Sequence, residues 1–141
     1  MITSIAISFC WVTLGSMLFF GAVVAPAVFT ALDEKPAGQF LRLLFPRIYL
    51  FCGLFSGLST GLFAIEKQWP AALVLGLTCI LFFYARGPLT RRINESRDAQ
   101  LSGDEAAGRR FDRLHKQSTR IFGMQFIAML SVAIWLGDFS S

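Results

Sequence analysis

Charged residues are scarce in this sequence, and they are absent from four long stretches of it. Only 16% of the 141 residues are Asp, Glu, Lys or Arg, compared with about 25% in soluble domains. No charged side chain occurs in residues 1–32, 48–65, 68–85 or 121–137. This distribution excludes an ordinary soluble domain, because the helices of such a domain carry polar side chains on the face that meets water.

The four stretches also lack histidine, so they contain no ionisable Asp, Glu, Lys, Arg or His side chain. Ionisable groups inside a membrane usually mark proton relays or ion pathways. Their absence weighs against an ion-coupled transporter that relies on a charged relay. It leaves open a pathway for an apolar molecule.

Histidine and cysteine are too few and too scattered for most metal or redox sites. His115 is the only histidine, which excludes a haem held by two histidines of one chain. Cys10, Cys52 and Cys79 fall in three different stretches without CxxC spacing, which argues against a disulfide, a redox pair or a closed zinc site. A catalytic triad at His115 would need an acid such as Asp98 in a geometry that the sequence does not supply. We therefore predict no catalytic residue, no metal site and no cofactor.

Apolar residues, by contrast, make up 55% of the chain. A helix needs roughly 20 apolar residues to cross the hydrocarbon core of a bilayer, and each stretch is close to that length or longer. The first stretch lacks a basic start and exceeds the roughly 7–15 apolar residues of a secretory signal, so we interpret it as a retained helix. The predicted fold class is an all-α, membrane-embedded four-helix bundle in which helices 3 and 4 extend as a cytoplasmic hairpin. It forms a single transmembrane domain over 1–141, with helices near 3–31, 38–65, 70–100 and 104–137, spans near 3–31, 46–65, 70–86 and 120–137, and the hairpin near 87–119.

Lys and Arg are distributed unevenly among the three connections between these helices. Twelve of the 13 lie in or beside the first and third connections, and only Lys67 lies in the second. By the positive-inside rule, the basic connections face the cytoplasm. We therefore predict an integral plasma membrane protein, of the bacterial inner membrane type, whose termini are both periplasmic or extracellular.

The third connection is predicted to be helical rather than a flexible loop. Glu105 and Arg109, like Asp112 and Lys116, form acid-before-base pairs four residues apart, which favours a helix. A tight turn is predicted at 101–104. The partners we expect are the lipid bilayer and, at the basic hairpin, anionic lipids, which are attracted by about 1 kcal/mol per Lys or Arg near the surface. Acidic residues interspersed among the basic ones argue against nucleic acid as a partner.

Prolines and glycines inside the apolar stretches predict kinks and close contacts. Pro26 and Pro46 each remove a backbone donor from a helix and are expected to kink it. Gly53, Gly57 and Gly61 are spaced by four residues, so a second helix can approach this stripe closely in lipid. Packing within the chain is the favoured use of the stripe, and a homodimer seam or a larger membrane complex is the alternative.

The histidine belongs to a polar face of the last helix. His115, Ser118 and Gln125 are spaced so that they share one side of a helix. Such side chains are expensive to aim at lipid and should turn into the bundle. The antiparallel end of the third helix and the start of the second should bring partners there, and we expect one of them to hydrogen-bond His115. The candidate polar site at the cytoplasmic end is therefore His115, Ser118, Gln125, Asn94, Asp98 and Tyr49.

Three motifs resemble those of a known family of small membrane proteins. GAVVAPAVFTAL at 21–32, LFPRIY at 44–49 and FDRLHKQS at 111–118 resemble, in order and spacing, the transmembrane protein 205-like family. The resemblance covers nearly the whole chain and implies a four-helix membrane protein, but it implies no established activity. Phe122 stands where such proteins often have an asparagine, and Gln125 lies on the same face. The family pattern falls on Pro26, Phe29, Phe45, Pro46, Tyr49, Leu114, His115 and Ser118, with Asn94 and Asp98 in the polar stretch after the third helix.

Three classes of function fit these features. The first hypothesis is a non-enzymatic bundle that acts as an assembly partner or accessory protein. The second is the binding or passage of a small hydrophobic or metal-bearing compound between kinked helices. The third and least favoured is a membrane enzyme or a cofactor-binding subunit.

Overall fold

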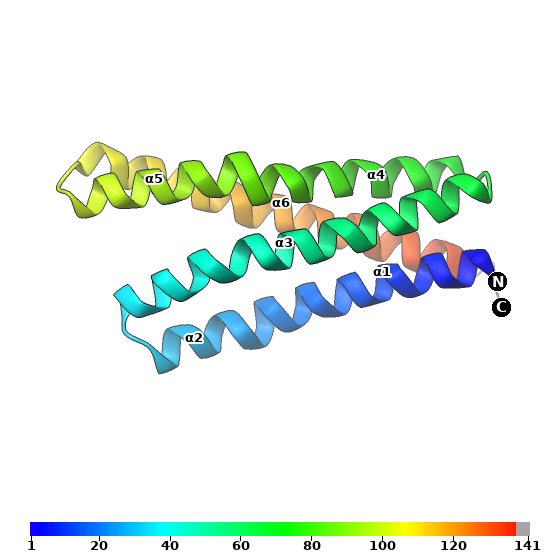
Figure 1. Ribbon diagram of the computed structural model, residues 1–141, viewed down its shortest axis with the longest axis horizontal. Helices are drawn as coiled ribbons and strands as arrows, with labels where there is room; N and C mark the ends of the chain where they lie inside the picture. Colours follow the sequence, from blue (N-terminus) through cyan, green and yellow to red (C-terminus); the bar gives the residue numbers. More distant parts are fainter. Residues whose placement is uncertain (138–141) are drawn as a thin grey trace.

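The computed structural model describes residues 1–137, and every regular element among them is a helix (Figure 1). Two short π-helical segments divide the first and third long helices. In chain order the elements are α1 (Ile2–Phe19), η1 (Phe20–Val24), α2 (Ala25–Ala31), α3 (Glu34–Ile65), α4 (Trp69–Tyr84), η2 (Ala85–Leu89), α5 (Thr90–Leu101) and α6 (Glu105–Gly137).

These elements form four rods that are long and apolar enough to cross a membrane. The rods comprise Ile2–Ala31, Glu34–Ile65, Trp69–Leu101 and Glu105–Gly137, each with 30 to 33 residues. Each therefore exceeds the roughly 20 residues that a span requires. The predicted all-α fold of four apolar helices is confirmed.

The second rod begins at Glu34 rather than at the predicted residue 38. Asp33 has an extended backbone, and its carbonyl accepts a hydrogen bond from the amide of Ala37 at 2.9 Å. Pro36 lies in the first turn, where a helix does not need the proline's missing amide hydrogen. The helix can therefore start directly after Asp33.

The turn between α5 and α6 forms where the sequence predicts it. α5 ends at Leu101, and Gly103 has a positive φ of 100°, a conformation that glycine adopts without strain. The carboxylate of Asp104 accepts a hydrogen bond from the amide of Ala107 at 3.1 Å and so caps the start of α6. The two helices pack side by side as a hairpin.

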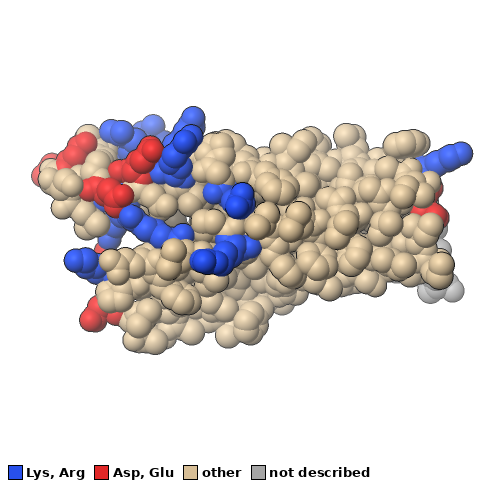
Figure 2. Space-filling view, in the orientation of Figure 1, with Lys and Arg blue, Asp and Glu red and all other residues tan. Residues whose placement is uncertain are grey.

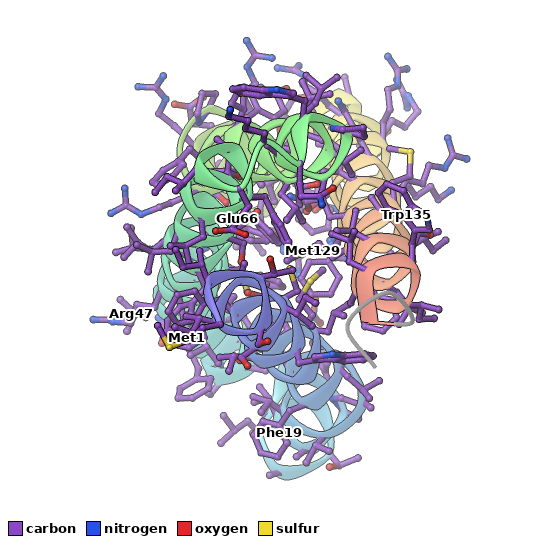
Figure 3. The ribbon with its side chains drawn as sticks, turned by 90° about the vertical axis from the view of Figure 1, so that its right-hand side faces the viewer. Met1, Phe19, Arg47, Glu66, Met129 and Trp135 are labelled. Atoms are coloured by element: carbon purple, nitrogen blue, oxygen red, sulfur yellow. The ribbon has the colours of Figure 1, made fainter. Side chains whose placement is uncertain are left out.

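Charged residues gather toward the ends of the bundle on the face that Figure 2 shows, and large apolar side chains are exposed between them. Large side chains such as Phe19 and Ile127 are 60% and 65% exposed. In the view along the bundle, Phe19 and Arg47 point outward and Met129 points between the helices (Figure 3). An apolar belt of this size fits a lipid environment.

Inside the belt, short polar side chains join the helices. Ser56 on α3 donates a hydrogen bond to the carbonyl of Leu75 on α4 at 2.9 Å, and Ser59 donates one to the carbonyl of Ala6 on α1 at 3.0 Å. Both serines are completely buried. Such bonds hold helices together in lipid, where burial of apolar surface does not drive their association.

The four rods close at one end and separate at the other. α1 packs against α3 and α6 near the chain start, and α4 packs against α3 and α6. At the opposite end α5 pairs with α6 and α2 packs against α3, whereas within the described residues no Cα atom of α2 lies within 8 Å of one in α5 or α6 (Figure 1). We call this second end, which carries most of the Lys and Arg residues, the basic end (Figure 2).

The two prolines that were expected to kink helices behave differently. Pro26 follows the π-helical segment η1, in which the regular α-helix is interrupted. Pro46 lies inside α3, which continues across it without interruption. Pro88 lies inside the second π-helical segment, η2. A widened turn accommodates a proline because it rearranges the hydrogen bonds that the missing donor disturbs.

The glycine stripe on α3 contacts α4, but over a shorter length than predicted. A Cβ atom added to Gly53 would lie 3.2 Å from the Phe83 ring, and one added to Gly57 would lie 3.3 Å from the sulfur of Cys79. A Cβ atom on Gly61 would meet nothing within 4 Å. Only the first two glycines therefore permit close packing, because Gly61 lies on the exposed surface of α3.

This difference predicts that Gly57→Leu destabilises the protein whereas Gly61→Leu does not. The new side chain at position 57 must displace α4, and overpacking of this kind costs about 1–3 kcal/mol. Leu58 is 53% exposed, so Leu58→Ala should also have little effect. Thermal unfolding of the three variants in one detergent measures the difference. Equal melting temperatures for the two leucine variants would contradict the assigned contact.

Candidate functional site

A pocket of about 340 Å³ opens between the helices at the basic end. It lies between α3 and the α5–α6 hairpin, with α2 at one side, and reaches Tyr49 in the core of the bundle. Its lining residues come from α2, α3, α5 and α6: Phe29, Glu34, Gly38, Leu41, Arg42, Phe45, Tyr49, Thr90, Ile93, Asn94, Arg97, Phe111, His115 and Ser118.

Aromatic pairs form part of the pocket wall on two different helices. Phe45 and Tyr49 on α3 are stacked, with ring centroids 5.8 Å apart and planes inclined by 27°. Phe111 and His115 on α6 are also stacked, at 5.9 Å and 12°. Each pair is separated by four residues, so the helix itself places the rings above one another. The pocket therefore has an apolar interior with flat walls.

One hydrogen bond ties the two aromatic helices together at the deep side of the pocket. The hydroxyl oxygens of Tyr49 and Ser118 are 3.1 Å apart. Tyr49 is only 3% exposed, and its ring also contacts those of Phe82 and Phe122. Two members of the predicted polar site are thus direct partners.

His115 lines the pocket but does not make the hydrogen bond that we expected. Within residues 1–137 its imidazole has no hydrogen-bond partner, and the bond from Thr119 goes to its backbone carbonyl. The expectation was wrong because two of the candidate partners, Tyr49 and Asp98, bond to other side chains. Tyr49 pairs with Ser118, which lies one turn nearer the closed bundle, and Asp98 pairs with Arg42.

Two ion pairs cross the mouth of the pocket between α3 and α5. Arg42 on α3 donates to the carboxylate of Asp98 on α5 at 2.5 Å. Arg97 on α5 pairs with Glu34 on α3, so the two bridges run in opposite directions. Few other contacts join these helices. The ion pairs are therefore a principal link between α3 and the hairpin.

Arg97 is held in place by two further contacts. It donates to the side-chain oxygen of Gln100 at 2.9 Å, and its guanidinium carbon lies 5.3 Å from the centroid of the Phe111 ring. A guanidinium at this distance from an aromatic face is attracted by the ring. Arg97 is thus positioned before any ligand arrives.

The two arginines were not predicted as site residues, although the sequence contains a signal for both. Arg42 precedes Phe45 and Tyr49 by three and seven residues, which places it on the same helix face. Arg97 follows Asn94 by three residues, on the face that we had assigned to the site. Their positive charge was interpreted as a topology signal and, in the hairpin, as an attraction for anionic lipid, rather than as part of a site.

Gln125 is separate from the pocket. It is 1% exposed, and its side-chain nitrogen donates to the carbonyl of Thr78 on α4 at 3.2 Å. Its side-chain oxygen has no partner among the described residues. Gln125 therefore joins α6 to α4 inside the bundle, while Tyr49, Asn94, His115 and Ser118 line the pocket and Asp98 lies beside it.

A second hollow lies on the outer side of α6, between the long side chains of residues such as Arg109, Arg113 and Arg120. All of its lining residues belong to α6, so it has no opposite wall that would enclose a ligand. Over the described part of the chain, no group of three or more His, Cys, Asp or Glu residues is arranged to hold a metal ion. The pocket at the basic end is therefore the better candidate site.

The comparisons with known proteins address the family but not the activity. Residues 9–99 match the family model described as "Domain of unknown function (DUF4149)". The chain belongs to this family. No curated protein and no solved structure matches it. The matched region includes the pocket residues of α2, α3 and α5 and ends before those of α6.

Proposed function

We propose that this DUF4149 protein binds a small amphipathic compound in the pocket at the basic end, and that it acts through binding rather than catalysis. The observation that carries this proposal is a pocket with apolar walls and a polar mouth, built by four helices of a membrane bundle. Binding sites for small molecules are typically apolar clefts with a few placed polar groups. The second of our three hypotheses therefore has more support than the first.

The size and the polarity of the pocket both support a compound with an apolar part. Its volume of about 340 Å³ is near the lower end of the range for small-molecule sites, roughly 300–1,000 Å³. Leu41, Phe45, Ile93 and Phe111 provide apolar contacts. The pocket fits one polar head and part of one chain better than a whole two-chain lipid.

The separation of α2 from α6 supports entry from the bilayer. Within the described residues no Cα atom of α2 lies within 8 Å of one in α6, and α2 carries Phe29 at the pocket wall. An apolar chain bound in the pocket can extend through this side into lipid. A compound dissolved in the membrane would then reach the site without passing through water.

Filling the pocket should abolish binding. Gly38 lines the pocket and a Cβ atom there meets nothing within 4 Å, so Gly38→Leu places apolar atoms in free space without displacing a helix. The probe is a single-chain amphiphile with a photoreactive diazirine in its chain, added to the protein in phosphatidylcholine nanodiscs. We expect saturable labelling of α3, α5 and α6 peptides, reduced about tenfold by the substitution, as a loss of roughly 1.4 kcal/mol would produce.

Gly15→Leu is the matched control. Gly15 is exposed on α1, it also has nothing within 4 Å of an added Cβ atom, and it does not line the pocket. Labelling should be unchanged in this variant. Labelling that does not saturate, or that both variants leave intact, would contradict the proposal.

We also propose that the basic end faces the cytoplasm of a bacterium and that the protein resides in the plasma membrane. The excess of Lys and Arg at this end supports the orientation. Arg113, Lys116 and Arg120 on the outer side of α6 would then lie near anionic lipid head groups. The motifs that resemble the transmembrane protein 205-like family support the same architecture and add no activity.

Cysteine labelling in intact cells tests the orientation. Ser102→Cys places a thiol in the α5–α6 turn, and Glu66→Cys places one in the turn between α3 and α4, at the opposite end. A membrane-impermeant maleimide should label Glu66→Cys in intact cells and Ser102→Cys only after lysis. The parent protein, in which Cys10 and Cys52 are buried and Cys79 is partly buried, is the background control. The reverse pattern would refute the proposed orientation.

A further inference from the structure

The arginines at the pocket are more shielded from solvent than the acids that neutralise them. The side chains of Arg42 and Arg97 are 34% and 27% exposed, whereas those of Asp98 and Glu34 are 60% and 80% exposed. Both arginines line the pocket, and Asp98 does not. Glu34 lines the pocket beside them, so two positive charges and one negative charge face this space, and the more exposed Asp98 lies outside it.

Hydrogen-bond donors outnumber acceptors around the same space. Each arginine carries five N–H groups, and the contacts of Arg42 and Arg97 leave several of them unused. The side chains of Asn94 and His115 also line the pocket and, within residues 1–137, have no hydrogen-bond partner. A group of oxygen acceptors with negative charge complements this arrangement.

We infer that the pocket takes an anionic amphiphile, with a carboxylate or phosphate head at Arg42 and Arg97 and an alkyl chain among the apolar residues. This inference rests on the proposed function and names the chemical class of its ligand. Arginine binds both kinds of head through paired N–H···O bonds. The chain extends from the head toward the opening between α2 and α6.

The two ion pairs make this binding an exchange of partners. Exposed ion pairs contribute little to stability because water and salt screen them. An acidic head that enters the pocket replaces Glu34 and Asp98 as partner of the arginines, and the released carboxylates return to water. No proton or electron is transferred. A carboxylate head brings one negative charge to the two arginines and a phosphate head brings about two, while two carboxylates are released to water.

Substitutions of the arginines and substitutions of their acidic partners should therefore have opposite effects on the binding of the ligand. Arg42→Gln and Arg97→Gln remove the groups that bind the head. Glu34→Gln and Asp98→Asn break the same ion pairs but leave the arginines free. A purely structural role for the ion pairs would give the same result from either side.

The experiment compares two diazirine probes with the same chain, an alkyl phosphate and the corresponding alcohol, in phosphatidylcholine nanodiscs. The measured quantity is the ratio of phosphate to alcohol labelling at the pocket peptides. We expect the phosphate to be preferred about tenfold, the ratio to fall about tenfold in each arginine variant, and the ratio to rise in each acid variant. Arg47→Gln is the control, since Arg47 is on α3 but does not line the pocket.

The outcomes separate this inference from the proposed function. Equal, saturable labelling by the two probes that Gly38→Leu removes would overturn the anionic head and retain the binding site. A ratio that falls in the acid variants as well as in the arginine variants would also overturn it. Absence of saturable labelling by either probe would overturn the proposed function itself.

Competition identifies the source of the acidic head. Unlabelled fatty acid added from solution and phosphatidic acid incorporated into the nanodisc carry the two kinds of head. Displacement of the alkyl phosphate probe by the fatty acid indicates a free acid as ligand, and displacement by phosphatidic acid indicates a membrane lipid. Displacement by neither, at concentrations that saturate the probe, would contradict the inference.

Discussion

Lipid offers no hydrogen-bond partner to a backbone amide or carbonyl, so every such group within the bilayer must be satisfied inside the protein. This constraint dictates four long helices rather than shorter elements joined by loops. The same medium makes charged side chains costly, which accounts for their absence from residues 1–32, 48–65, 68–85 and 121–137. The polar groups that remain inside, among them Ser56, Ser59 and the amide nitrogen of Gln125, bond to backbone carbonyls of neighbouring helices.

The same helices behave differently where they extend past the apolar belt. There the backbone is already satisfied within each helix, and polar side chains can face one another or water. α2 separates from the hairpin, and two ion pairs rather than close packing link α3 to α5. At this end apolar and charged side chains alternate along the same helices, so the walls of the pocket carry both Phe45 and Arg97.

The fold was predictable because the constraint acts on the sequence directly. Charge-free stretches mark the helices, and Ser102, Gly103 and Asp104 mark the turn of the hairpin. The start of α3 was predicted too late because a polar first turn, here with Pro36, carries no hydrophobic periodicity.

The site was only partly predictable, because helical spacing gives a shared face but not the rotation or reach of a side chain. Tyr49, Asn94, His115 and Ser118 do line one pocket. The partner of His115 was predicted wrongly. Tyr49 hydrogen-bonds instead to Ser118, which lies about one helical turn further along α6. The long side chains of Arg42 and Arg97 span the space between helices, which no spacing within one helix reveals.

The central claim is that the basic end holds a ligand between α3 and the hairpin. An experimental structure of the protein in nanodiscs made from its native lipids, at a resolution that shows lipid chains, tests this claim most directly. The account predicts elongated density that begins at Arg42 and Arg97 and leaves between α2 and α6. A pocket closed by direct packing of α2 against α6, without such density, would contradict it.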